Sequence, residues 1–297
     1  MQGGVPLVAS MTLSRDTLVE VVARNRGFGY VRVRDAVRSL VLPGPDGRTI
    51  DPPPSALRRL MAECADAAVA TASAPIAIPA ALVDEYLAPI GRIRDLVESA
   101  PDEFFSLDHD PFVKDLALCL GQLFPAGARL VDLRSGLPRR LLLWQRGGAL
   151  RALRFFLSAG GFAPWLQTHV DPRDLSQFSE AGLVRTYLRV AAMLEANPNV
   201  LGVFGGSWFY DPCLEALSPH LAYLQRLPRG YGAGLFRAPT TPGNVRSALL
   251  KSKRRKEAYE QGSYRPQSYF LAWPRRGVLA WARASGGSPH ELPQRPI

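Results

Sequence analysis

The 297-residue chain is poor in residues that build covalent or metal-held frameworks. It contains three cysteines, Cys64, Cys119 and Cys213, and four histidines. The cysteines are odd in number and far apart, and they include no CxxC pair, so neither a disulfide framework nor a zinc site is expected. Residues 108–110 form an Asp-His-Asp triplet, which is better explained by helix capping than by metal binding. We predict no bound metal and a reducing compartment.

The chain also lacks long hydrophobic runs. No uncharged apolar stretch reaches the roughly 18 residues of a membrane-spanning helix, and the N-terminus, MQGGVPLVAS, does not resemble a secretory signal. Hydrophobic residues make up 47% of the chain, which is enough for a sizeable core in roughly two domains. We therefore expect a cytoplasmic protein. Its high content of Ala, Arg and Pro fits a bacterial, GC-rich genome.

Acidic residues are scarce near the C-terminus. Residues 237–297 contain twelve Lys or Arg and only three Glu, which accounts for nearly all of the net charge of +10. The densest part is KSKRRK, residues 251–256. Unbalanced positive charge attracts phosphates, nucleic acid or an acidic membrane face. Nucleic acid is the less favoured partner, because no RNP-like, helix-turn-helix or zinc-finger pattern is present.

Hydrophobic periodicity predicts a mainly helical region over residues 1–125, an α/β domain over 126–284 and a disordered tail over 285–297. In the first region, residues 27–37 alternate in polarity and are compatible with a strand, and Asp108 or Asp110 is the predicted cap of a helix. The α/β domain is predicted to contain strands at 129–134, 163–170, 201–210, 233–237, 268–273 and 277–283, and helices at 148–159, 181–196, 213–226 and 243–261. Alternation followed by a closing pair of strands predicts a mixed central sheet with flanking helices.

Residues 166–211 read as strand, helix and strand, which implies a crossover between two parallel strands. Ligands of open α/β sheets usually bind at the carboxyl ends of such strands. The polar and aromatic residues of this stretch collect at those two ends, in THVDPRD and GGSWFYDP. We therefore place the candidate site there.

The order of elements from residue 166 to 237 resembles the GNAT-type acyl-CoA N-acyltransferases. LQTHV corresponds to the first strand of that family's splayed pair, LGVFGGSWFYD to the second and GAGLFR to the strand that follows. The resemblance implies a fold with a pantetheine arm between the splayed strands. It also implies a thioester co-substrate, acyl-CoA or acyl carrier protein, and no permanently bound cofactor.

The family's pyrophosphate-binding turn has Gln or Arg, two residues, Gly, one residue, then Gly or Ala. Residues 171–185, DPRDLSQFSEAGLVR, depart from that pattern and offer Gln177, Ser179 and Gly182 as candidates for donor binding. The departure suggests a donor that is held differently, such as acyl carrier protein, whose acidic surface would suit the basic C-terminal region. Arg254, Arg255 and Lys256 are candidates to meet donor phosphates.

Four residues are candidates for catalysis. His169 could serve as a general base because the free pKa of histidine is about 6.5, with Asp171 assisting it. Asp211 could orient His169 or bind the amine, and Tyr210 could protonate the leaving thiolate. The alternatives are structural: His169 capping a turn, Asp211 capping a helix, and Tyr210 as a core aromatic.

Four further residues are candidates for substrate binding: Arg173, Ser207, Trp208 and Tyr223. Arg173 could bind a phosphate or carboxylate, or simply pair with a neighbouring aspartate, and Tyr223 is a second candidate to protonate the thiolate. The Arg-studded apolar segment 139–157 indicates either a core-packing helix or a segment for a long acyl chain or membrane surface.

The sequence thus predicts an acyltransferase that acts on a small-molecule or lipid-like amine, with peripheral contact at the inner membrane face. The alternative is a non-catalytic protein that binds nucleic acid or acidic lipid through its basic C-terminal face.

Overall fold

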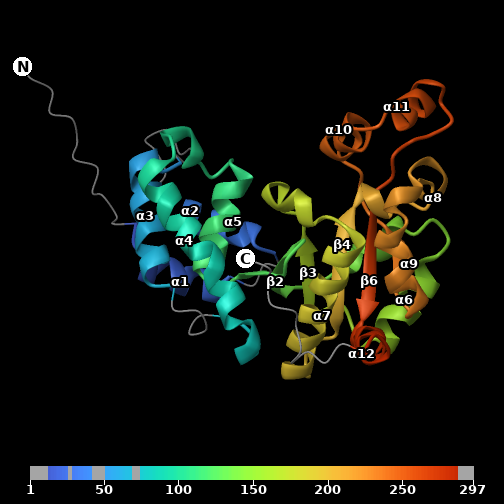
Figure 1. Ribbon diagram of the computed structural model, residues 1–297, viewed down its shortest axis with the longest axis horizontal. Coiled ribbons are helices and arrows are strands. Elements are labelled where there is room, and N and C mark those ends of the chain that lie inside the picture. Colours follow the sequence, from blue (N-terminus) through green and yellow to red (C-terminus); the bar gives the residue numbers. More distant parts are fainter. Residues whose placement is uncertain (1–12, 26–28, 42–50, 69–73, 287–297) are drawn as a thin grey trace, which may run out of the picture. The chain divides into compact units, whose positions relative to one another are not determined.

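The computed structural model describes residues 13–25, 29–41, 51–68 and 74–286 (Figure 1). The chain forms two compact units. The first contains the described residues of 13–73 and 87–122, and the second contains 74–86 and 123–286. Apart from residues 285 and 286, the tail predicted to be disordered lies outside the described residues.

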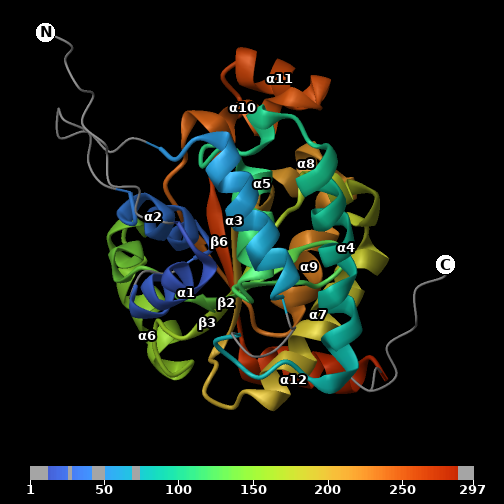
Figure 2. The ribbon, with the colours of Figure 1, turned by 90° about the vertical axis from the view of Figure 1, so that its left-hand side faces the viewer.

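The described part of the first unit is built from helices (Figure 2). They are α1 (Arg15–Arg24), α2 (Val31–Ser39), α3 (Pro54–Asp66), the part of α4 (Val83–Ser99) from residue 87 on, η2 (Asp102–Phe104) and α5 (Asp110–Cys119). The strand considered for residues 27–37 is wrong from residue 31 on, because α2 buries Val33, Ala36 and Val37 at helical spacing. Residues 27 and 28 lie outside the described residues. Arg32 is buried as well, and its guanidinium donates to the side chain of Gln122.

The cap predicted for α5 is also wrong. The residue at the N-cap is His109, and no side chain caps the helix. The two aspartates form ion pairs instead: Asp108 with Arg38 at 3.0 Å and Asp110 with Lys114 at 2.6 Å. Within the described residues, no group of three His, Cys, Asp or Glu side chains is placed to hold a metal ion.

The second unit contains a six-stranded mixed sheet, as the alternation of elements predicts. Its strands follow the order β1-β2-β3-β4-β6-β5. They are β1 (Leu123–Pro125), β2 (Leu130–Ser135), β3 (Trp165–His169), β4 (Gly202–Ser207), β5 (Gly234–Arg237) and β6 (Tyr269–Pro274). Only β3 and β4 pair in parallel, and the other four pairings are antiparallel.

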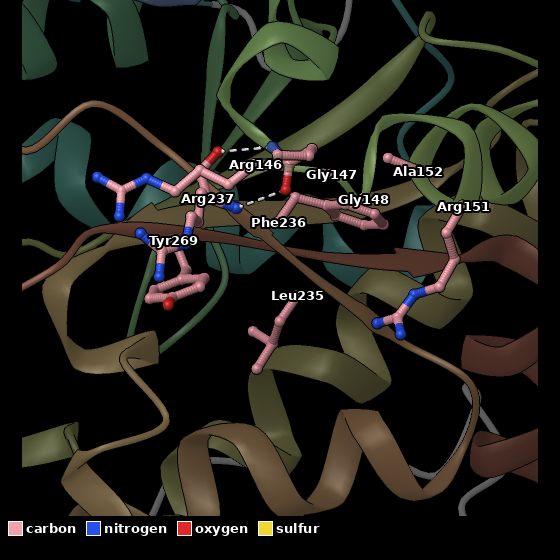
Figure 3. Close-up of a pocket in the computed structure, with 10 residues that line it drawn as sticks. Arg146, Gly147, Gly148, Arg151, Ala152, Leu235, Phe236, Arg237 and Tyr269 are labelled. Atoms are coloured by element: carbon pink, nitrogen blue, oxygen red, sulfur yellow. Dashed lines mark hydrogen bonds between the residues drawn. The ribbon is translucent and has the colours of Figure 1, made fainter.

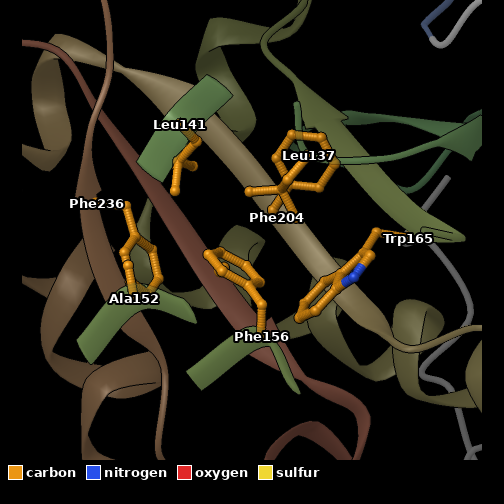
Figure 4. Packing of buried hydrophobic residues seen from close by; sticks show 8 residues of the cluster. Leu137, Leu141, Ala152, Phe156, Trp165, Phe204 and Phe236 are labelled. Atoms are coloured by element: carbon orange, nitrogen blue, oxygen red, sulfur yellow. The ribbon is translucent and has the colours of Figure 1, made fainter. Parts of the chain in front are cut away.

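Helices cover both faces of this sheet. One face packs against α7 (Glu180–Ala196) and α12 (Arg275–Ala284), where Tyr187 and Trp281 contact Trp273 of β6 with ring centroids 5.0 and 5.6 Å apart. The other face packs against η3 (Arg139–Trp144) and α6 (Ala149–Ser158). There Phe156 of α6 contacts both Trp165 and Phe236, and Figure 4 shows this cluster.

The remaining elements of the second unit precede or connect the strands. They are η1 (Ala80–Leu82), η4 (Pro172–Gln177), η5 (Trp208–Tyr210), α8 (Leu214–Leu217), η6 (Pro219–Leu221), α9 (Tyr223–Gly230), α10 (Pro242–Leu250) and α11 (Lys253–Glu260). The helix predicted over 213–226 is thus divided into three short helices, and that over 243–261 into two. No helix in the described part of the chain is long and apolar enough to cross a lipid bilayer.

The strand predicted over 277–283 is wrong, because this segment belongs to α12. Pro274 is extended and stands at the N-cap, so the chain leaves β6 and starts the helix at once. The buried residues Val278, Leu279, Trp281 and Ala282 follow helical spacing. The short apolar run is compatible with the residue spacing of a strand or of a helix. Contact with α7 stabilises the helix.

Candidate active site at the ends of the parallel strands

The pairing of β3 with β4 stops before β4 does. Its last pair is Thr168 with Gly205, whereas β4 continues to Ser207, which pairs with Tyr269 of β6. Successive residues of a strand turn their backbone N–H and C=O groups to opposite sides. One of Gly206 and Ser207 therefore directs these groups toward the side where β3 has ended, at the carboxyl end of the parallel pair.

A buried guanidinium bridges these two strand ends. Arg129 immediately precedes β2, and only 1% of its surface is exposed. Its Nη1 donates to Thr168 Oγ1 at 3.2 Å and to Tyr210 Oη at 2.6 Å. Thr168 belongs to β3 and Tyr210 follows β4, so one cation fixes the end of the strand pair from the α7 side.

The guanidinium of Arg129 lies in an aromatic cage. Its carbon is 5.6, 5.3 and 5.7 Å from the ring centroids of Phe178, Phe209 and Tyr210. Its Nε and Nη2 atoms are buried and have no hydrogen-bond partner among the described residues, and no carboxylate there pairs with it. Because a buried cation without an anionic partner, and with N–H groups left unbonded, is costly, Nε and Nη2 mark a place that a ligand oxygen would stabilise.

Two phenols near Arg129, those of Tyr187 and Tyr223, are held neutral. Burial raises the pKa of Tyr187 well above its usual range, and Arg129 opposes that rise. Burial likewise raises the pKa of Tyr223. Burial lowers the pKa of Arg129 itself, but the oxygens of the surrounding tyrosines leave it above its ordinary value. The site therefore combines a permanent positive charge with the protonated phenols of these two residues.

A second cationic feature lies beside the edge strand β5. A cavity of about 500 Å³ is lined by Arg146, Arg151, Arg237 and Tyr269, among others (Figure 3). The Gln145 side chain fixes one wall, because Nε2 donates to the carbonyl of Arg237 at 3.1 Å and Oε1 accepts from its N–H at 3.0 Å.

The structure places His169 and Tyr210 on different faces of the sheet. His169 is the last residue of β3 and is half-buried, with its Nε2 enclosed. Adjacent strand residues point to opposite faces, and it is Thr168 that points toward Arg129 and Tyr210. The predicted catalytic residues therefore do not form one cluster.

The other predicted residues after β3 make local contacts. Asp171 is buried, accepts from the backbone N–H of Arg173 at 3.0 Å and pairs with its guanidinium at 2.7 Å. This is the structural alternative considered for Arg173. Ser179 caps α7 by accepting from the N–H of Gly182.

Gly182 is required for a close approach of backbone segments. A Cβ atom at this position would lie 1.9 Å from the carbonyl oxygen of Gln177, so any other residue would push η4 away from α7. The turn between β3 and α7 is thus occupied by its own chain. Close packing of η4 against α7 therefore accounts for a glycine at this position.

The predicted residues after β4 hold neighbouring segments together. Asp211 is buried and accepts from the N–H groups of Cys213 and Gln267, both at 3.0 Å. Ser207 caps η5. The hydroxyl of Tyr223 donates to the carbonyl of Phe178 at 3.1 Å. Trp208 lies 4.9 Å from the guanidinium carbon of Arg255.

The basic run of residues 251–256 contains both a buried cation and exposed ones. Arg255 is 4% exposed and donates to Ala248 O at 2.6 Å and to Ser218 Oγ at 2.5 Å. Burial lowers its pKa. Arg254 and Lys256 remain exposed on α11, which lies beyond the start of β6 in Figure 1. Only these two of the three predicted cations can meet a donor phosphate.

Sequence reasoning missed Arg129 and the three pocket arginines. Arg129 stands in a short turn, PAGARLVDL, with no motif around it, and its partners come from segments 39 to 81 positions away. For the segment that contains Arg146 and Arg151, the sequence indicates either a core-packing helix with a solvated arginine face or an acyl-chain or membrane segment, and neither predicts a cavity. The one available signal was the Gly147–Gly148 pair, which separates η3 from α6 and opens the pocket.

No protein-family model, no curated protein and no solved structure matches this chain. A function can therefore be inferred only from the geometry of the strand ends and of the arginine-lined pocket.

Proposed function

We propose that the protein transfers an acyl group from a thioester donor, acyl-CoA or acyl carrier protein, to an amine. The observation that carries this proposal is the parallel pair β3/β4, which lies within an otherwise antiparallel sheet and loses its pairing after Thr168 and Gly205. Such an end is the arrangement that the GNAT-type resemblance implies for holding a pantetheine arm.

The buried guanidinium at the end of the parallel pair would supply the first element of the chemistry. The buried nitrogens of Arg129 lie at these strand ends. Donors of this kind stabilise the negative charge that develops on the oxygen when the amine attacks.

Proton transfers would use residues on both faces of the sheet. Tyr210 accepts a hydrogen bond from Arg129 through its oxygen, and its hydroxyl would donate a proton to the leaving thiolate. His169 remains the proposed base that takes a proton from the amine, acting from the other face at the end of β3.

Exposed leucines support a lipid-like substrate and contact with a membrane surface. Leu143, Leu150 and Leu157 are 84%, 69% and 65% exposed. They follow one another at seven-residue intervals along η3 and α6, and arginines lie between them. Apolar side chains flanked by arginines are typical of interfacial segments.

The proposal is tested by thioester consumption. Purified protein is given short-chain and long-chain acyl-CoA or acyl carrier protein with a panel of amines, and the released thiol is measured. We expect Tyr210→Phe to lower kcat about 100-fold. Tyr223→Phe is the comparison variant, because the Tyr223 hydroxyl already donates to the Phe178 carbonyl and loss of activity there instead would assign the proton to Tyr223. A chain that consumes neither donor, or a Tyr210→Phe variant as active as Tyr223→Phe, would contradict acyl transfer.

The second candidate function is non-catalytic anion binding through α11. It is favoured by the exposure of Lys253, Arg254 and Lys256. The ion pairs of Lys253 with Glu257 and of Lys256 with Glu260 are long, at 3.7 and 3.9 Å. Replacing these three cations with Glu would abolish salt-sensitive binding of anions on this reading. On the acyltransferase reading, the same variant retains kcat and only raises KM for the donor.

A further inference from the structure

The cavity beside β5 has no role in the proposed acyl transfer. Its volume is about 500 Å³, and its walls come from the turn after η3, the first turn of α6 and the end of β5. The lining is Gln145, Arg146, Gly147, Gly148, Arg151, Ala152, Leu235, Phe236, Arg237 and Tyr269. Figure 3 shows Arg146, Arg237 and Tyr269 at one end of the cavity and Arg151 at the other.

The positive charge of this cavity is not balanced by the protein. Among the described residues, no carboxylate pairs with Arg146, Arg151 or Arg237. Arg237 and Arg146 both oppose the rise that burial causes in the pKa of Tyr269, which places both guanidinium groups near this phenol. Three guanidinium groups thus line one small cavity without a counter-ion.

The start of α6 adds backbone donors to the same cavity. Gly148 is its N-cap and has no side chain to cap it, and the first helical bond runs from Ala152 N to Gly148 O. The N–H groups of residues 149–151 have no partner among the described residues. Free N–H groups and the positive end of the helix dipole favour an anion at this position.

We propose that this cavity binds the phosphate group of a phosphate monoester. Such a group carries a charge of about −1.5 to −2 at neutral pH, with three acceptor oxygens. It therefore matches several arginines and N–H groups better than a singly charged carboxylate does. Arginine forks bind phosphate oxygens in pairs. The apolar part of the ligand would lie on Leu235 and Phe236, and Arg151 would meet a second polar group.

The phosphate could belong to a water-soluble ester or to a lipid headgroup, and one pair of probes separates these sources. Glycerol 3-phosphate is titrated by calorimetry, with glycerol as the blank. Phosphatidylcholine vesicles with and without phosphatidic acid are tested by flotation. Binding of glycerol 3-phosphate indicates a soluble ligand, and binding only to the phosphatidic acid vesicles indicates a lipid.

Variants decide whether the cavity is the site. We expect Arg146→Gln and Arg237→Gln each to weaken binding of the responsive probe by about tenfold or more. Both variants keep the two hydrogen bonds between the Gln145 side chain and the backbone of residue 237. Arg226→Gln is the matched control, since Arg226 is exposed on α9 and forms no ion pair among the described residues. Unchanged circular dichroism and melting temperature establish that the variants fold.

Three results would overturn the proposal: no binding of either probe, equal affinity in the cavity variants and wild type, or loss of binding only in Arg254→Gln, which would place the anion on α11. Binding is measured without any acyl donor. The proposed acyl transfer can therefore fail or hold independently of the phosphate site.

Discussion

Arg129 Nη1 lies 2.6 Å from Tyr210 Oη, although the two residues are 81 positions apart in the chain. This bond joins the turn before β2 to the segment after β4, and the same Nη1 also donates to Thr168 near the end of β3. Two nitrogens of the same guanidinium stay without a partner among the described residues. A charge held in this way resembles a binding element more than a structural one, because structural buried cations are paired.

Replacing Arg129 separates these two roles. We expect Arg129→Met to leave the free energy of unfolding unchanged or to raise it by about 1 kcal/mol. The substitution removes a buried charge that has no carboxylate partner and replaces it with an apolar side chain of similar volume. The same variant should lose most thioester consumption. Urea unfolding and the thiol-release assay measure the two effects.

The matched control is Arg189→Met. Arg189 is also buried, but it pairs with Glu85, and Nη2 lies 2.7 Å from Oε1. Its loss leaves a partly buried carboxylate unpaired, so we expect destabilisation of about 1–3 kcal/mol. If Arg129→Met destabilises the protein as much as Arg189→Met does, Arg129 is a structural cation and the binding role is wrong.

Substitution of Gly205 tests how tightly the strand ends are packed. A Cβ atom there would lie 2.6 Å from Thr168 Oγ1 and 2.8 Å from Tyr210 Oη. We expect Gly205→Ala to lower the free energy of unfolding by about 1–3 kcal/mol through overpacking. The cost should shrink in a Thr168→Ala background, which removes the nearest atom. Gly230→Ala, with no atom within 4 Å of the added Cβ, should be neutral, and equal costs at both glycines would refute the close contact.

Alkaline pH should destabilise the protein through Cys64. Burial raises the pKa of this thiol from 9.0 to about 12. A raised folded-state pKa contributes stability that is fully present below pH 9 and is lost as the pH rises toward the folded value. Above about pH 9, wild type should lose about 1.4 kcal/mol per pH unit more than Cys64→Ala does. Parallel pH profiles of urea unfolding for the two proteins would contradict this expectation.

The exposed leucines predict attachment to lipid surfaces. We expect the double variant Leu150→Ser, Leu157→Ser to lose flotation with anionic vesicles, because the apolar side chains that would enter the bilayer are removed. Leu250→Ser is the control, since Leu250 is 74% exposed on α10. Equal flotation of the double variant and the control would remove the support for a membrane contact. Thermal melting should be unaffected in either variant.

The sequence predicts β3, α7 and the start of β4 well. The end of β4 is wrong, because the strand predicted over 201–210 stops at Ser207 and residues 208–210 form the short helix η5. The prediction also fails at α12, where the short apolar run of residues 275–284 suits a strand as well as a helix. The helical conformation there depends on contact with α7. The prediction fails again at Arg129, whose surroundings are assembled from β3, η4 and the end of β4. No local pattern encodes such a cage, because each contributing residue has an ordinary role in its own segment.

The site predictions show the same division. Caps and ion pairs within a few residues, such as Asp171 with Arg173, are considered correctly as structural alternatives. The face of the sheet on which a side chain lies depends on the register of its strand. The sequence favours His169 whichever face it occupies, and the structure alone decides that Thr168 faces Arg129.

Gln145 has a consequence for self-association. Strand β5 is the edge of the sheet, and an edge exposes backbone groups that another chain can pair with. The side-chain amide of Gln145 occupies both backbone groups of Arg237, as a neighbouring strand would. One side chain therefore satisfies the backbone groups at the end of this edge strand. Loss of that amide would leave the N–H and C=O of Arg237 free to pair with a strand of a second molecule.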